Sequence, residues 1–276
     1  MYLKAVSNIT LSALMFALAG MIVKYVSYKM DVFSLVFWRN VFSFICVLFV
    51  GWHSGKLSFK SERKKLHALR SLFTFFALIT YFYAVKNTEL STAVLLQQTS
   101  PVFVPIISFL VFRRLSDRYV WIGTFVGFLG VTITSCMVTH SINGGDLSGI
   151  ISGAMGGAAT ITIWMMSDTE SPYRQMLFFS LYTLLYSFVF LPLVWDSFNL
   201  SLLPYLIILG VITTLAQYFL SVACANAPTD KIVSWSYLSV IFAALLGYLG
   251  WNEKITISML LGMILIVLGA EISLRK

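Results

Sequence analysis

Charged side chains are scarce in this sequence of 276 residues. Lys, Arg, Asp and Glu together make up 11% of the chain, whereas hydrophobic residues make up 59%. An average soluble domain contains about 25% charged residues, and a soluble chain with so few would expose large apolar patches to water. The composition therefore excludes an ordinary soluble protein. An aromatic content of 16% also excludes a disordered chain, which requires low hydrophobicity and high charge.

Cysteine and histidine are also rare, with three of each. Cys46, Cys136 and Cys224 lie inside long apolar runs, without the spacing of a disulfide framework or a zinc site. The sequence contains no His-Glu-x-x-His helix, no Gly-x-Ser-x-Gly turn and no phosphate-binding loop. We therefore expect no metal, no cofactor and no enzymatic activity, and we expect the cysteines to pack as small apolar residues.

Acidic residues are missing from the middle of the apolar runs. A proton relay inside a membrane normally contains such a carboxylate, so the sequence gives no support for proton coupling. The acidic residues at the ends of runs or in loops include Asp146, Asp168, Glu170, Asp196, Asp230, Glu253 and Glu271.

Long apolar runs occupy most of the chain. A helix needs about 20 apolar residues to cross the hydrocarbon core of a bilayer, and continuous rather than alternating hydrophobicity excludes a membrane β-barrel. The first run is too long for a signal peptide and lacks a cleavage site. The sequence predicts an all-α polytopic membrane protein with ten transmembrane helices, at about 5–23, 32–51, 68–86, 91–112, 119–138, 149–166, 176–195, 202–223, 232–250 and 256–273.

Basic residues predict the orientation, because short cytoplasmic loops carry an excess of Lys and Arg. With the N-terminus inside, the cytoplasmic side holds 14 of them: Lys4, Lys56, Lys60, Arg63, Lys64, Lys65, Arg70, Arg113, Arg114, Arg118, Arg174, Lys231, Arg275 and Lys276. The other side holds 5: Lys24, Lys29, Arg39, Lys86 and Lys254. We expect both termini in the cytoplasm and a location in the inner (cytoplasmic) membrane. This distribution explains the net charge of +8 without a nucleic-acid partner.

The two halves of the sequence align at an offset of about 140 residues, which places Gly123 near Gly262 after one deletion. Five spans in each half is an odd number, so the halves must have opposite orientations. Inverted repeats are typical of secondary transporters, which bind substrate at the repeat interface near the middle of the membrane. We therefore expect two inverted five-helix repeats, residues 1–138 and 139–276.

Two long segments resemble the ends of the two EamA repeats of the drug/metabolite transporter superfamily: STAVLLQQTSPVFVPIISFLVFRRLSDRYVWIGTFVGFLGVTIT and DKIVSWSYLSVIFAALLGYLGWNEKITISMLLGMILIVLGAEIS. Two others, SALMFALAGMIVKYVS and FSLVFWRNVFSFI, resemble the family's first two spans. The first repeat departs from the family pattern, because Arg113 stands where the family usually has Glu before the fifth span. The second repeat keeps a Glu at the corresponding position, Glu253. The resemblance implies ten helices, a cavity lined mainly by spans 1–4 and 6–9, and spans 5 and 10 at the periphery.

Two basic residues are candidates for substrate binding. Arg39 lies inside the second run, where a charge costs about 2.5–3.5 kcal/mol and must therefore face protein or water. It is either an anion-binding group in the cavity or a structural residue bonded to backbone carbonyls. Lys24 ends the first span and either points at the same vestibule or extends to the outer interface.

The fourth span carries polar residues and two prolines. Gln97, Pro101 and Pro105 recur at helical spacing, and each proline frees a carbonyl one turn earlier. Broken spans with free carbonyls form binding sites or hinges in transporters. We therefore predict that Gln97 binds substrate and that Pro101 and Pro105 form a hinge.

Other spans supply the amide and aromatic groups of an amphipathic pocket. Each of these residues has an alternative role in packing or in the interfacial aromatic belt. The candidates are Tyr83, Asn87, Trp164, Tyr182, Gln217, Trp235 and Tyr237. Glycines at small-xxx-small spacing are instead predicted to bring helices close together: Gly123, Gly127, Gly149, Gly153 and Gly157.

These patterns predict a secondary transporter that moves a small organic metabolite, such as an amino acid or a related zwitterion or anion, by alternating access. An alternative with the same fold is uptake or exchange of S-adenosylmethionine, which some members of the superfamily carry, or of a nucleotide-like metabolite. Alternatives from other classes are a membrane-embedded lipid-handling enzyme and a channel or receptor. The expected partners are a small-molecule substrate and the lipid bilayer, with the chain as a monomer or homodimer.

Overall fold

The computed structural model describes residues 2–55, 57–88, 90–113, 116–135, 143–190, 200–251 and 257–275. In these ranges all regular secondary structure is helical, which confirms the prediction of an all-α protein. Several positions used in the sequence predictions lie outside the described residues: Lys56, Arg114, Cys136, the repeat boundary at 138 and 139, Asp196, Glu253, Lys254 and Lys276.

The helices follow the apolar runs of the sequence. Their order is α1 (Tyr2–Ser27), α2 (Val32–His53), α3 (Lys64–Asn87), α4 (Leu90–Gln97), α5 (Ser100–Phe112), α6 (Arg118–Ser135), α7 (Gly144–Met166), α8 (Pro172–Phe190), the 3₁₀ turn η2 (Leu200–Leu202), α9 (Leu203–Asn226), α10 (Thr229–Ile232), the 3₁₀ segment η3 (Val233–Tyr237), α11 (Leu238–Trp251) and α12 (Ile257–Ser273).

Polar residues between the runs mark where helices begin. The Asp31 carboxylate accepts a hydrogen bond from the backbone N–H of Phe33 at 2.8 Å and so caps α2. Asn143 and Asp146 form a capping box at the start of α7, since each side chain accepts from the other's backbone N–H, at 3.1 and 2.9 Å. These contacts satisfy backbone donors that the first helical turn leaves unpaired.

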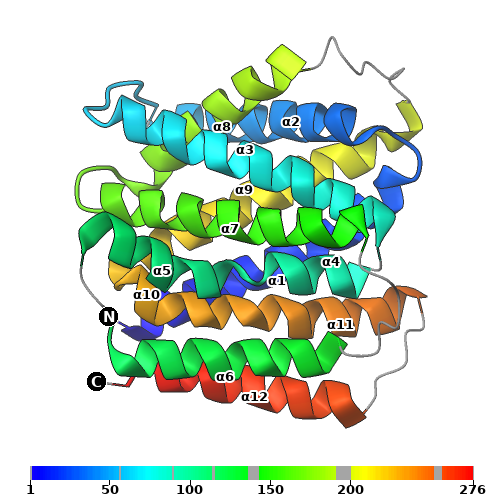
Figure 1. Ribbon diagram of the computed structural model, residues 1–276. Helices are drawn as coiled ribbons and strands as arrows, with labels where there is room; N and C mark the ends of the chain where they lie inside the picture. The colour runs from blue at the N-terminus through cyan, green and yellow to red at the C-terminus, as the bar shows by residue number, and fades with distance from the viewer. Residues whose placement is uncertain are drawn as a thin grey trace.

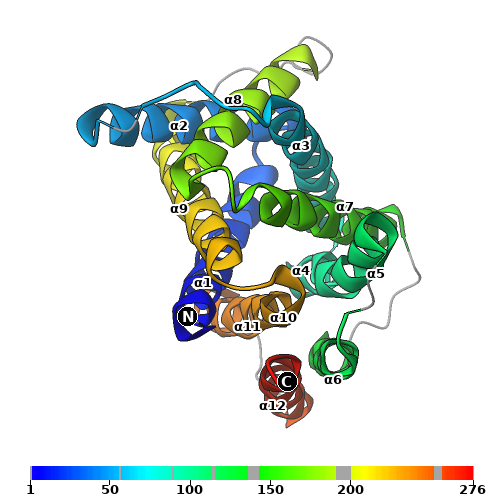
Figure 2. The ribbon, with the colours of Figure 1, turned by 90° about the vertical axis from the view of Figure 1, so that its left-hand side faces the viewer.

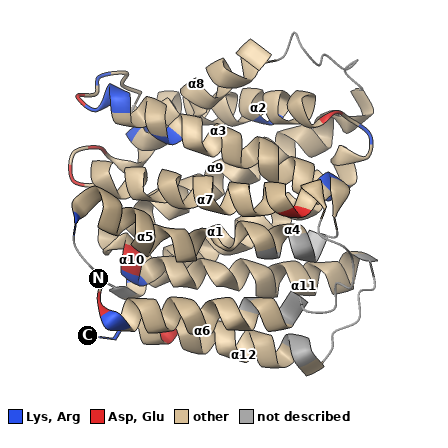
Figure 3. Cartoon of the chain, in the orientation of Figure 1, with Lys and Arg blue, Asp and Glu red and all other residues tan. Residues whose placement is uncertain are grey.

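Six helical segments are long and apolar enough to cross a membrane, within the part of the chain that the structure describes. They are Leu3–Ser27, Val32–His53, Lys64–Asn87, Gly144–Met166, Leu200–Asn226 and Thr229–Gly250, and Ser100–Phe112 and Leu260–Ser273 are shorter apolar helices. The helices run roughly side by side, and both termini lie at the same end of the bundle (Figure 1). Lys and Arg gather at this end, hereafter the terminal end (Figure 3).

Seen along the helices, α1, α9, α7, α4 with α5, and α10 with α11 surround the centre of the bundle (Figure 2). Helices α2, α3 and α8 close one side. On the opposite side α6 and α12 stand together outside this ring. The resemblance to EamA repeats implied this peripheral position for the fifth and tenth spans.

Glycines bring α6 and α12 into backbone contact. A Cβ atom on Gly123 would lie 2.4 Å from the carbonyl oxygen of Gly269, and one on Gly130 would lie 2.6 Å from the carbonyl oxygen of Gly262. Side chains larger than hydrogen therefore have no room between these helices. The predicted role of Gly123 in close helix packing is confirmed.

Helix α7 uses glycines in the same way against α4 and α5. A Cβ atom on Gly149 would lie 2.6 Å from Cβ of Leu96. Cβ atoms on Gly153 and Gly157 would lie 3.0 and 3.1 Å from the carbonyl oxygens of Gln97 and Ser100. The prediction that these three glycines pack closely is confirmed, and their partners lie on either side of the junction between α4 and α5.

Two of the predicted spans are interrupted rather than continuous. The run expected at 91–112 forms α4 and α5, which are separated at Gln98 and Thr99, and the run expected at 232–250 contains the 3₁₀ segment η3. The two interruptions meet, because Gln98 Nε2 donates hydrogen bonds to the Ser236 carbonyl and to Ser239 Oγ. Gln98 and Ser239 are 141 residues apart, close to the offset between the two halves of the sequence.

Candidate substrate cavity

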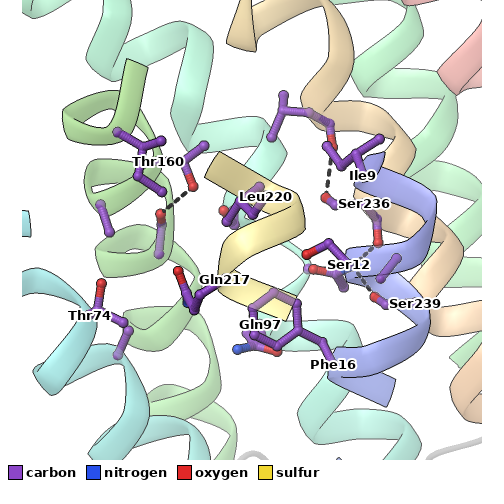
Figure 4. A pocket seen from close by; sticks show the side chains of 18 of the residues that line it. Ile9, Ser12, Phe16, Thr74, Gln97, Thr160, Gln217, Leu220, Ser236 and Ser239 are labelled. Carbon is purple, nitrogen blue, oxygen red and sulfur yellow. Dashed lines mark hydrogen bonds between the residues drawn. The ribbon is translucent and has the colours of Figure 1, made fainter. Parts of the chain in front are cut away.

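A cavity lies at the centre of the bundle, where the two interrupted spans meet α1, α3, α7 and α9. The side chains labelled in Figure 4 come from all of these elements and surround a common space. The volume open to the centres of water-sized molecules is about 130 Å³. A single water needs about 10–15 Å³ by the same measure, so the cavity has room for several waters or a small organic molecule.

The cavity wall is uncharged among the described residues. Its apolar part includes Ile9, Phe16 and Leu220. Its polar part consists of hydroxyl and amide groups, from Ser12, Thr74, Gln97, Gln98, Ser100, Thr160, Gln217, Ser236 and Ser239. An apolar surface with a few hydrogen-bonding groups is typical of a site for a small organic ligand.

Two of the ten predicted binding residues, Gln97 and Gln217, line this cavity. Gln97 ends α4, next to the junction with α5, and Gln217 projects from α9. The predicted hinge residue Pro101 lies in the first turn of α5, where its missing N–H leaves no helical bond unmade. Pro105 lies inside α5. The binding and hinge roles of these residues remain predictions.

Arg39 lies away from the cavity wall, between α2, α8 and α9. The side chain is fully buried; its Nε donates to Thr213 Oγ1 at 3.0 Å, and an Nη donates to Asn40 Oδ1 at 2.8 Å. Asn40 in turn donates to the carbonyl oxygen of Thr183 at 3.2 Å. The guanidinium therefore links three helices through side-chain acceptors rather than through the carbonyls of a helix end.

Lys24, Tyr83 and Asn87 lie together at the end of the bundle opposite the termini. Lys24 Nζ donates to the carbonyl oxygens of Val85 and Thr88, at 3.1 and 2.7 Å, and so satisfies acceptors at the end of α3. Asn87 Nδ2 donates to the carbonyl oxygen of Tyr83 at 2.7 Å, on an exposed surface. None of the three lines the cavity.

The predicted aromatic residues are also outside the cavity wall. Trp164 packs edge-to-face on Phe112 near the terminal end, and Tyr182 lies in a stack with Phe178 and Tyr186. Trp235 packs beside Ile9 and Ile232. Tyr237 is completely buried, and its hydroxyl donates to the carbonyl oxygen of Thr124 on α6 at 3.3 Å. In the described part of the wall, Phe16 is the one aromatic side chain.

Arg70 is a residue that the sequence analysis missed as a candidate. Because Arg70 lies near the start of a predicted span, it counts among the basic residues that predict the orientation in the membrane. Its side chain, however, is completely buried. Its guanidinium donates to Gln175 Oε1 at 3.3 Å, to Gln217 Oε1 at 3.1 Å and to Ser221 Oγ at 3.4 Å. Gln217 lines the cavity, so Arg70 stands directly behind its wall.

A cluster of polar and charged groups lies around Glu170 at the terminal end of the bundle. Glu170, in the loop between α7 and α8, accepts hydrogen bonds from Ser61 Oγ at 2.5 Å and from an Arg174 Nη at 3.0 Å. His67 Nε2 lies 3.8 Å from the same carboxylate. Burial alone would raise the pKa of Glu170, but the hydrogen bonds from Ser61 and Arg174 and the nearby basic groups outweigh it and lower the pKa below its ordinary value.

We predict that Glu170→Gln lowers the melting temperature at neutral pH and makes the melting temperature less dependent on pH in the acidic range. Since folding lowers the pKa of Glu170, its stabilising effect is present above the ordinary value of 4.5 and is lost as the pH falls through the lower folded value. Melting curves of detergent-purified protein from neutral pH to below 4.5 test this. The control is Asp168→Asn, on the exposed side of the same loop. Parallel pH curves for wild type and Glu170→Gln would contradict the prediction.

The described features define a class of protein. An all-helical chain with six described helices able to cross a bilayer is a multi-pass membrane protein, and the uncharged cavity at the centre of its bundle has the composition typical of small-molecule sites. The model of the EamA-like transporter family matches the chain twice, over residues 3–136 and 143–275. The chain belongs to this family, which confirms the resemblance seen in the sequence. It is a transporter of a small metabolite, not an enzyme.

Curated relatives match over nearly the full chain. The S-adenosylmethionine uptake transporter of Rickettsia felis is 24% identical over 269 residues, which are 96% of this chain and 90% of the relative. The pseudopaline exporter CntI of Pseudomonas aeruginosa is 24% identical over 264 residues, which are 94% and 92% of the two chains. A solved crystal structure has the same fold, with a TM-score of 0.77 at 17% identity, covering 98% of this chain and 95% of the other.

Proposed function

We propose that the chain is a secondary transporter that crosses the inner membrane ten times and works by alternating access. In this proposal residues 1–138 and 139–276 are two inverted repeats of five helices. The observation that carries it is the contact between the two interrupted spans at the cavity, through Gln98 and Ser239. Interrupted helices that meet at a central site are typical of transporters built from inverted repeats.

The distribution of basic residues supports a cytoplasmic location of both termini. Lys and Arg gather at the terminal end of the bundle (Figure 3), and positive charge in short loops is typical of the cytoplasmic side. The cavity then extends from the middle of the bundle toward the cytoplasmic side, since Phe16 and Gly156 lie near the middles of α1 and α7 while Ile9 and Ile163 lie closer to the terminal ends of these helices. We propose a monomer or homodimer as the transporting unit.

For the substrate we propose an amino acid or a related zwitterion or anion. The small cavity, with apolar walls and several amide and hydroxyl groups, supports this size and chemistry. The relatives favour one second candidate, S-adenosylmethionine or a nucleotide-like metabolite, because one of them is an S-adenosylmethionine uptake transporter. The same comparison includes an exporter, so import and export are both compatible with the family.

The test is counterflow in proteoliposomes. Purified protein is reconstituted into vesicles loaded with one unlabelled compound, and uptake of the same compound in labelled form is measured. Amino acids, nucleosides and S-adenosylmethionine form the panel. A transporter that alternates between two states should show transient accumulation that requires internal substrate, whereas a channel should only equilibrate the label. Absence of counterflow for every compound would contradict the proposal.

We predict that Pro101→Ala slows transport more than it weakens binding. Alanine restores a backbone N–H and favours helix, so α4 and α5 can join and stabilise one state of the interrupted span. The maximal counterflow rate should fall several-fold, with little change in the dissociation constant measured in detergent. The matched control is Pro204→Ala, in the first turn of the uninterrupted α9. Equal rates for Pro101→Ala and wild type would show that the proline only packs.

A further inference from the structure

The guanidinium of Arg70 is a buried positive charge without an acidic partner among the described residues. Its side chain is completely buried, and all three acceptors that it reaches are neutral: Gln175, Gln217 and Ser221. Its Nε has no hydrogen-bond partner in the described part of the chain. The free energy of a charge buried in this way falls when an anion binds close to it.

The contact with Arg70 fixes the orientation of the Gln217 amide. A guanidinium only donates hydrogen bonds, so the Gln217 atom that faces it must be the carbonyl oxygen, which lies 3.1 Å away. The Nε2 group, with its two N–H donors, is then the part of the amide left for other partners. Because Gln217 lines the cavity, it offers the ligand a donor with the charge of Arg70 behind it.

Gln98 has the opposite orientation across the cavity wall. Its amide meets the Ser236 carbonyl, which only accepts, so the atom that faces Ser236 must be Nε2. Its Oε1 is then the group left for other partners, and it is an acceptor. Figure 4 shows Gln217 on α9, and Ser236 and Ser239 on the interrupted span, around the same space.

We propose that Arg70 and Gln217 form the anion-recognising end of the cavity, and that Gln98 Oε1 forms its donor-recognising end. The ligand class that fits is a small zwitterion with a carboxylate at one end and an amino group at the other. The carboxylate accepts from Gln217 Nε2 under the field of Arg70, and the amino group donates to Gln98. Gln217 is the contact residue, and Arg70 acts as its positioning residue. This inference rests on the proposed transport function.

The experiment compares matched ligand pairs that differ in the carboxylate. The pairs are S-adenosylmethionine with its decarboxylated analogue, and L-methionine with L-methioninamide. Dissociation constants are measured on detergent-purified wild type and on Gln217→Met, Gln217→Glu, Arg70→Met and Arg70→Lys. Gln217→Glu keeps an acceptor for Arg70 and so protects folding, but it removes the N–H donors and compensates the positive charge of the guanidinium with a carboxylate. The matched control is Gln175→Met, since Gln175 accepts from the same guanidinium but does not line the cavity.

Wild type should bind the carboxylate member of a pair about 10- to 100-fold more tightly, the range of a hydrogen bond to a charged group. This ratio should fall to near one in Gln217→Glu and Arg70→Met, persist in Gln175→Met, and survive in part in Arg70→Lys. A ratio that stays high in Gln217→Glu and Arg70→Met would overturn the inference. The inference would also be overturned if wild type bound the ligands without a carboxylate more tightly, even if counterflow still occurs. If counterflow fails for the whole panel, the proposed function falls, and this inference with it.

Discussion

Gly269→Ala is expected to destabilise the protein strongly. The added Cβ would lie 2.4 Å from the backbone nitrogen of Gly127 and 2.6 Å from the carbonyl oxygen of Gly123. Backbone atoms cannot rotate away as a flexible side chain can, so α6 and α12 must separate along their contact. Overpacking of a close-packed interior costs about 1–3 kcal/mol, and a backbone clash belongs at the upper end of this range. Gly269→Leu should prevent accumulation of folded protein.

Thermal unfolding followed by size-exclusion chromatography in detergent measures this effect. The matched control is Gly144→Ala, because the nearest atom to an added Cβ there is the Tyr83 hydroxyl at 4.0 Å. Gly144→Ala should melt at or slightly above the wild-type temperature, since alanine favours helix over glycine. If both alanine variants melt together, the contact between α6 and α12 is looser than the glycine distances indicate.

Ala159→Phe is expected to abolish transport while the protein remains folded. Ala159 of α7 is buried and lines the cavity, so a phenyl ring at this position occupies the space that a substrate needs. The cavity has room for the ring, so the loss of stability should be small compared with that of Gly269→Ala. Counterflow of any compound that wild type carries should fall to the level of empty vesicles.

The control for this variant is Leu215→Phe, on the exposed face of α9. It introduces the same side chain on the same bundle, away from the cavity, and should transport at the wild-type rate. Melting temperatures of both variants establish that they are folded. Wild-type counterflow by Ala159→Phe would mean that the substrate path does not pass through this cavity.

The helices could be predicted from the sequence because each follows an apolar run that is bounded by polar residues such as Asp31 and Asn143. The side chains that face the cavity were harder to predict. Trp235 and Tyr237 were predicted from their residue type alone, and residue type does not say which way a side chain points. Both lie in η3, where Val233 and Ser236 are the residues that face the cavity. Arg70 was assigned to the cytoplasmic surface because charge counting considers position along the chain and not direction.

The interruption between α4 and α5 had a partial signal in the sequence. Pro101 and Pro105 predicted a disturbed span, and the helix does divide at Gln98 and Thr99, just before the first proline. No proline or glycine lies within η3 itself, so its 3₁₀ geometry had no comparable signal. It depends on contacts with α1, α6 and α12, elements far away in the sequence.

The bridge from Gln98 to Ser236 and Ser239 restricts how the two interrupted helices can move against each other. Hydrogen bonds of short reach fix the separation of two points but leave the angle between the helices free within a limited range. Sliding by one residue displaces a helix by about 1.5 Å along its axis and would break the bridge, whereas tilting about Gln98 preserves it. For the alternating access proposed above, the bridge would serve as a pivot: rocking about it would open one end of the bundle and close the other.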